Sequence, residues 1–342
     1  MLKHLRLKII PAAWMAALGV AAPLTGAQTL THLADPANAR ASPRDSASAS
    51  LDQALRSRLA SPDPANPSAN YVAAALETTD RAARVRYLAA ARIASPQEKL
   101  YLASLGLACV APVHGQPVEC EAMDRLADWA RRDQGNGLPA LLLADRARQR
   151  GEREAMVAYL ELAAGAPRFD DYSARAGLVL WDYVFASPIA ADPEVKARWV
   201  TARGVVAAST NWSDALNNTC VTASARTDAW RSACAQLGEA LLSFAGTLYG
   251  RRLGDSALER NTADAAVQRQ AAQRRAAVDA LVARCGAARL EVEQNLDSPD
   301  PRAREAAIGD EHQWLEAWSR FGEVGTCERV RDGLPRLEPS PP

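Results

Sequence analysis

The chain has 342 residues, with 40 basic and 40 acidic side chains and therefore a formal net charge of zero. A balanced surface of this kind lacks the dense positive field of a typical nucleic-acid-binding protein, so we expect no nucleic-acid partner. The length is sufficient for one large hydrophobic core or two smaller ones.

The chain begins with the pattern of a secretory signal peptide. A basic opening with Lys3, Arg6 and Lys8 precedes an apolar run from Ile9 to Leu24, and small residues follow up to Ala27. The run is shorter than the roughly 20 residues that span a bilayer. We predict cleavage after residue 27, which leaves no integral membrane segment and a periplasmic or secreted protein. An uncleaved anchor is the alternative.

The two ends of the remaining chain differ from its middle. Residues 28–49 are rich in Ala, Ser, Asp and Pro without an apolar period, which predicts a flexible leader. Residues 332–342 contain four prolines and predict a disordered tail. The middle is alanine-rich with helical apolar spacing, so we predict an all-α array of roughly eleven or twelve helices packed as antiparallel hairpins. The array is either solenoid-like or divided into two lobes, 51–187 and 192–331.

Several helix boundaries carry local signals. Ser50 begins a capping box with Gln53, and Ser95 and Asp192 each precede a proline, so all three predict helix starts. Farther along the chain, apolar residues recur at steps of three and four, which predicts one buried helix face. This face comprises Trp230, Cys234, Leu237, Leu241, Phe244 and Leu248.

Six cysteines in an exported chain indicate disulfides, and the absence of any Cys-x-x-Cys pair argues against a metal site. Two pairs flank short segments, which favours Cys109–Cys120 and Cys220–Cys234 and leaves Cys285–Cys327. This pairing leaves no free thiol. In a two-lobed protein, loss of the last bond should loosen the chain after residue 295 and leave 51–187 folded.

Residues 137–167 form a predicted helical hairpin with Gly151-Glu152 at its turn and Pro167 at its end. Small or apolar residues occupy Ala140, Leu143, Ala144, Ala147, Met156, Leu160 and Ala163. The segment resembles one tetratricopeptide unit, although alanines replace the Trp, Gly and Tyr signature positions and no second copy follows at 34 residues. The resemblance implies a superhelix with a concave face that binds a peptide or protein. Any antiparallel helix pair with a glycine turn is the alternative.

Three places could carry chemistry or binding. Asp170 and Asp171 could supply a general acid and base, although an aspartate before a helix is more often a cap. His312 and Glu316 could share a helix face, but no second histidine completes a metal site. The arginines of the predicted hairpin could dock an acidic partner or form a solvated face; they are Arg146, Arg148, Arg150 and Arg153.

The sequence contains no Gly-x-Ser-x-Gly, His-Glu-x-x-His or phosphate-binding glycine motif. We therefore expect no cofactor and predict a non-catalytic scaffold or protein-interaction module, whose partner is another envelope or secreted protein or peptide. The alternative is an envelope hydrolase that acts on polysaccharide or peptidoglycan through a carboxylate pair.

Overall fold

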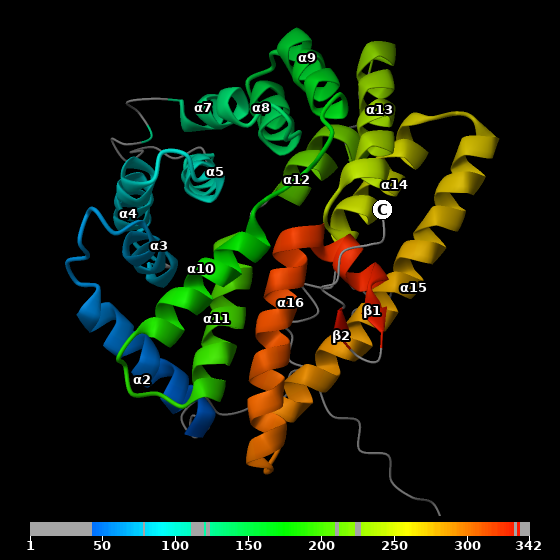
Figure 1. The fold of residues 1–342 in the computed structure, drawn as a ribbon. Helices are drawn as coiled ribbons and strands as arrows, with labels where there is room; N and C mark the ends of the chain where they lie inside the picture. Colours follow the sequence, from blue (N-terminus) through cyan, green and yellow to red (C-terminus); the bar gives the residue numbers. More distant parts are fainter. Residues whose placement is uncertain are drawn as a thin grey trace, which may run out of the picture.

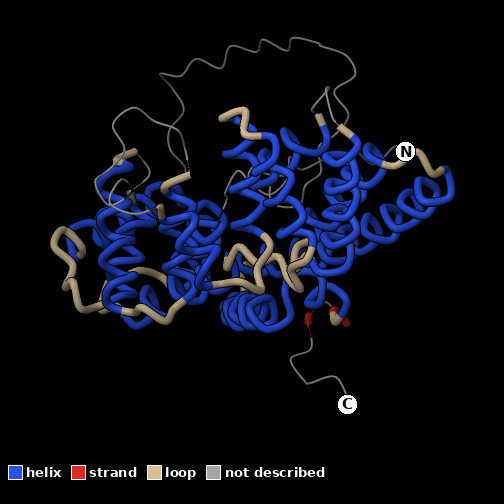
Figure 2. Tube along the Cα trace, turned by 90° about the horizontal axis from the view of Figure 1, so that it is seen from above, coloured by secondary structure: helices blue, strands red, loops and turns tan. Residues whose placement is uncertain are grey.

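The computed structural model describes residues 43–77, 79–110, 120, 124–208, 212–222, 227–331 and 334–335. The predicted signal peptide lies outside these residues, as does the leader up to residue 42. Within the described ranges the chain folds into fourteen α-helices, one π-helical turn and two very short strands (Figure 1; Figure 2). The all-α fold class predicted from the sequence is therefore confirmed.

The elements follow one another through short connections. They are α2 (Pro43–Arg58), α3 (Pro67–Leu76), α4 (Arg81–Ala94), α5 (Lys99–Ala108), α7 (Arg125–Arg132), α8 (Leu138–Gln149), α9 (Arg153–Ala164), α10 (Ser173–Ala186), α11 (Pro193–Ala208), α12 (Trp212–Leu216), the π-helical turn η1 (Asn217–Val221), α13 (Asp228–Phe244), α14 (Leu248–Asn261), α15 (Ala265–Leu296), α16 (Pro301–Glu328), β1 (Val330–Arg331) and β2 (Leu334–Pro335).

Two of the three predicted helix starts differ from the structure. Helix α2 already begins at Pro43, so Ser50 lies inside it and residues 43–49 are helical rather than part of a leader. Helix α5 begins at Lys99 instead of after Ser95, because the Glu98 side chain accepts the Leu100 N–H at 3.3 Å and caps the helix there. The start predicted at Asp192 is confirmed by α11.

The helices pack in a closed circuit rather than an open array. Each of α3, α4, α5, α7, α8 and α9 contacts the next in this order, and α9 contacts α13. The circuit continues through α14, α15 and α16 to α10, which returns to contact α3. Figure 1 shows this arrangement, with α10 and α16 crossing the middle of the molecule. The predicted hairpin is present as α8 and α9.

The hydrophobic core consists of two main clusters, and both join distant parts of the chain. The first combines residues between 51 and 105 with residues of α10, α11, α15 and α16. The second combines residues between 102 and 169 with residues between 212 and 257. Each cluster thus includes residues from both sides of the segment between 187 and 192, where the sequence suggested a division into lobes.

The structure contains the three disulfides predicted from the sequence. Cys109, at the end of α5, bonds Cys120, and Cys220 in η1 bonds Cys234 in α13, with Cα separations of 5.5 and 5.4 Å. Cys285 in α15 bonds Cys327 in α16 at a Cα separation of 5.3 Å.

The last described residues form a small antiparallel pairing that the sequence did not predict. Val330 pairs with Pro335 and Arg331 with Leu334, so part of the segment 332–342 belongs to a two-stranded ladder. Among the described helices, none combines the length and apolar character needed to cross a bilayer.

The contact between α14 and α15 includes a buried carboxyl group with poor hydrogen bonding. The side chain of Asp255 is 0% exposed, and neither oxygen accepts a hydrogen bond from a described residue. Its nearest ion-pair partner is Arg274, whose Nε lies 3.8 Å from Oδ1. Burial raises the pKa of Asp255 to about 6, although Arg274 and Arg275 oppose this shift; Glu239 and Glu259 add to it.

Because the pKa of Asp255 is raised in the folded protein, we expect the free energy of unfolding to depend on pH. Because the pKa is higher in the folded state, the free energy of unfolding should fall as the pH rises from about 4 to about 6, by up to about 3 kcal/mol. Asp255→Asn should remove that part of the profile. Denaturant titrations of both proteins between pH 4 and pH 7 test this; parallel profiles would contradict it.

Candidate functional site

A cleft of about 660 Å³ opens where four parts of the chain meet, and its volume lies in the range of ligand-binding pockets. Its walls come from the start of α5, the segment that leads into α10, the loop between α13 and α14, and the part of α16 before residue 323. The lining residues are Gln97, Glu98, Lys99, Arg168, Phe169, Asp170, Asp171, Tyr172, Ser173, Ala174, Arg175, Phe244, Gly246, Thr247, Trp318, Ser319, Arg320, Phe321 and Gly322.

Backbone hydrogen bonds join three of these wall segments to one another and to Gly137, beside the cleft. Gly137 N–H donates to the Arg168 carbonyl at 2.8 Å, and Gly246 N–H donates to the Phe169 carbonyl at 3.4 Å. Val324 N–H in turn donates to the Gly246 carbonyl at 3.1 Å. Four segments that are remote in sequence therefore form one ladder, which fixes their positions before any ligand binds.

Gly322 permits the close approach of α16 to this ladder. Its φ of 70° lies in the left-handed region, and it interrupts the helical backbone of α16. A Cβ at this position would lie 3.0 Å from the Gly246 carbonyl oxygen. A residue without a side chain is therefore required where α16 turns past the loop after α13.

The predicted pair Asp170 and Asp171 lies in the cleft, and both side chains accept backbone N–H groups in the turn that leads into α10. Asp170 Oδ1 accepts the Tyr172 N–H at 2.8 Å, and Asp171 Oδ1 accepts the Ser173 N–H at 3.0 Å. The pKa values of both carboxyl groups are raised above their ordinary value, and burial is the main cause. Neither aspartate is the N-cap of α10, which is Tyr172; both stabilise the preceding turn and line the cleft.

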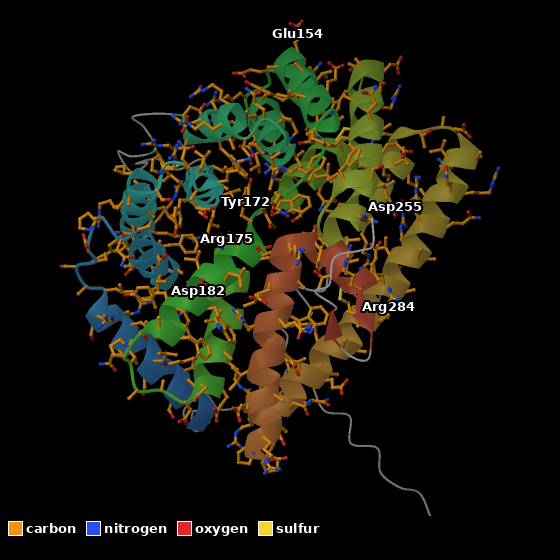
Figure 3. All side chains as sticks on the ribbon, in the orientation of Figure 1. Glu154, Tyr172, Arg175, Asp182, Asp255 and Arg284 are labelled. Carbon is orange, nitrogen blue, oxygen red and sulfur yellow. A yellow bond between two sulfur atoms is a disulfide. The ribbon has the colours of Figure 1, made fainter. Side chains whose placement is uncertain are left out.

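Tyr172 is the only described residue other than glycine with a positive φ, which is 61°. An L-residue with a side chain adopts this region at a cost in free energy, and such residues cluster at functional sites. The conformation directs the phenol to Asp133, whose Oδ2 accepts its hydrogen bond at 2.8 Å. Figure 3 shows Tyr172 and Arg175 at the same end of α10.

Asp133 is the centre of a polar network beneath this segment. Its side chain is 0% exposed and pairs with Lys99 at 3.1 Å and with Arg168. Besides Tyr172, Trp129 Nε1 donates to Oδ2 at 3.2 Å and Asn136 Nδ2 at 3.0 Å. Burial raises the pKa of Asp133, but these donors and cations outweigh it and hold the pKa below its ordinary value. The carboxylate therefore positions two cations that line the cleft.

A further carboxyl group, Glu323, lies directly after Gly322. Its Oε2 accepts the Leu248 N–H, the first of α14, at 2.9 Å. Burial raises the pKa of Glu323 to about 7; the Leu248 hydrogen bond opposes the shift, and the charge of Asp171 adds to it. Two carboxyl groups with raised pKa thus lie near the loop between α13 and α14, Asp171 from the segment before α10 and Glu323 from α16.

The cleft also has aromatic walls, and one ring is largely open. Phe244 is 49% exposed, whereas the predicted helix face would have buried it. Helix α13 ends at this residue, because Ala245 is extended and Thr247 caps the new helix that starts at Leu248. The prediction was therefore right up to Leu241 and wrong at Phe244; Leu248 is buried as predicted, but it belongs to the next helix, α14. Gly246-Thr247 is the sequence signal that could have revealed the break.

The other sequence candidates lie outside the cleft. Arg146 pairs with Asp124 at 2.6 Å, and Arg148 pairs with Asp145 at 2.8 Å, whereas Arg150 and Arg153 are exposed near the hairpin turn. His312 Nδ1 lies 3.9 Å from Glu316 Oε1. Within the part of the chain that the structure describes, no group of His, Cys, Asp and Glu is arranged to hold a metal ion.

No protein-family model matches the chain. Comparison with curated proteins gives no match. Comparison with solved structures gives none either.

Proposed function

We propose that this protein is an exported, non-catalytic interaction module that binds a segment of another envelope or secreted protein in the cleft. The observation that carries the proposal is the cleft itself, a ligand-sized opening with an exposed aromatic ring between segments that a backbone ladder holds in place. Pre-positioned walls reduce the entropy cost of binding.

Two features of the sequence support the same proposal. The basic and apolar start of the chain is typical of export, and the three disulfides suit an oxidising compartment such as the periplasm. The resemblance of residues 137–167 to a tetratricopeptide unit implies peptide or protein binding. The hairpin formed by α8 and α9 leads through residue 168 directly into the cleft wall.

The test is affinity capture from an envelope extract with three tagged proteins. Wild type and Leu162→Ser, a control at an exposed apolar residue outside the cleft, should capture the same partner, and Phe244→Ser should lose it. The two substitutions remove comparable apolar side chains from the surface, so only the cleft differs. Equal capture by all three proteins, or no capture by any, would refute the cleft as the binding site.

A second candidate is an envelope hydrolase acting on polysaccharide or peptidoglycan. The raised pKa values of Asp171 and Glu323 favour it, because one carboxyl group could donate a proton while the other activates water. Incubation with purified peptidoglycan measures this activity as released soluble fragments. Release by wild type and not by Glu323→Gln would support the hydrolase and overturn the non-catalytic proposal.

A further inference from the structure

One side of the cleft is cationic and the other is aromatic. If the proposed binding function holds, this division indicates the chemical class of the ligand. Cationic side chains come from the start of α5, from the segment before α10 and from the first turn of α10, namely Lys99, Arg168 and Arg175. The end of α13 contributes Phe244, and α16 contributes Trp318 and Phe321, with the Arg320 guanidinium 5.2 Å from the centre of the Phe321 ring.

The acidic residues of the lining are already bound to backbone N–H groups. Asp170 accepts the Tyr172 N–H and Asp171 accepts the Ser173 N–H at the start of α10, and Glu98 caps α5. A carboxylate at a helix N-terminus interacts favourably with the helix dipole, which reduces its repulsion of another anion. Asp170 also lies 3.7 Å from Arg168, which further compensates its charge.

The cations, in contrast, keep an open side toward the cleft. Lys99 is half exposed and is paired from beneath by the fully buried Asp133. Arg175 is 46% exposed and approaches Glu98 at 3.5 Å, which is too long for a strong hydrogen bond. A ligand carboxylate at the mouth would give this guanidinium the short, forked contact that it lacks.

The geometry also argues against a peptide that binds as an added strand. Strand addition requires a free backbone edge. The inner segment of the ladder is paired on both sides, at Arg168 with Asn136 and at Phe169 with Ala245. Recognition at this segment therefore depends on side chains rather than on the ligand backbone.

From these observations we infer that the cleft binds a peptide segment in which an apolar side chain stands next to a carboxylate group. The apolar side chain packs against Phe244, and the carboxylate is held by Arg175 with support from Lys99. The carboxylate is either a C-terminus or an acidic side chain.

The test uses labelled pentapeptides and fluorescence anisotropy at low ionic strength. The first is Ser-Gly-Ser-Gly-Phe with a free C-terminus, the second its C-terminal amide, the third has Ser in place of Phe, and the fourth is Ser-Gly-Ser-Asp-Phe amide. The first should bind at least about tenfold more tightly than the second and third, since a charge-assisted hydrogen bond and an apolar contact each contribute on this scale. Binding of the fourth but not the first would assign the carboxylate to a side chain.

Substitutions locate the two contacts separately. Arg175→Gln should weaken the carboxylate peptide about tenfold and leave the amide unchanged, Phe244→Ser should weaken both, and Leu162→Ser should change neither. Equal binding of acid and amide peptides would overturn the inference. Binding of chitotriose, but of none of the peptides, would likewise overturn it. If no probe binds while Phe244-dependent capture of a partner persists, the ligand class is wrong and the proposed function stands.

Discussion

Asp133→Ala is expected to lower the free energy of unfolding by about 3–5 kcal/mol, because removal of one partner from a buried ion pair leaves the other charges uncompensated. Lys99 and Arg168 would lose the carboxylate beneath them, and Trp129 Nε1 and Asn136 Nδ2 would lose their acceptor. The phenol of Tyr172 would lose its hydrogen-bond acceptor, and this bond supports the left-handed backbone conformation of that residue. Urea denaturation at pH 7 measures the effect.

Asp128→Ala is the matched control, since it removes a carboxylate from α7, the helix that ends directly before Asp133. Asp128 pairs with Arg132 at 2.9 Å and Arg131 at 3.4 Å, and both arginines are largely exposed. Exposed partners can turn to water, so the expected loss is about 1 kcal/mol or less. Asp133→Asn should fall between the two, because an amide keeps only part of the accepting capacity. Equal losses at both positions would show that the network does not anchor the cleft.

Local signals in the sequence were sufficient for the all-α fold class and for two of the three cysteine pairs, but not for every helix boundary. Two cysteine pairs lie 11 and 14 residues apart, and at such separations chain proximity alone favours a bond. The third pair followed by elimination. Helix starts such as Asp192-Pro193 carry their own capping signals, which do not depend on the rest of the fold.

The cleft required contacts that the sequence does not encode locally. Asp133 is unremarkable in the chain, yet its partners extend from Lys99 to Tyr172. Glu323 acquires its raised pKa from burial against the start of α14, 75 residues away in sequence. Asp170 and Asp171 were recognised only because they are adjacent, and their burial depends on how the four wall segments meet.

The side chain of Phe244 illustrates the limit of periodicity. Steps of three and four continue from Trp230 to Leu248, and the pattern itself does not show that one helix ends and another begins. The same spacing therefore predicted a buried ring where the structure has an exposed one. Gly246 and Thr247 interrupt the helix, and the interruption is what brings the ring to the cleft.

Cys285→Ser is expected to destabilise the protein by roughly 4 kcal/mol in the chain-entropy account of a loop closed over 42 residues. Differential scanning calorimetry should show a single transition at a lower temperature. We expect one transition because Cys285 and Cys327 belong to the first hydrophobic cluster, which also contains residues of α2 to α5 and of α10. Loosening α16 therefore exposes apolar surface on helices from both ends of the chain.

The division into lobes 51–187 and 192–331 leads to a different result for the same variant. It would confine the damage to the chain after residue 295, with local proteolysis there and an intact N-terminal transition. Limited proteolysis together with calorimetry distinguishes the two outcomes. Cys109→Ser is the matched variant, because Cys109 also packs against the first hydrophobic cluster but its disulfide closes a loop of only 11 residues. A single transition in both variants, with the larger shift for Cys285→Ser, would establish one cooperative core. Two separate transitions would show that α10 and α16 do not couple the halves, despite their direct contact.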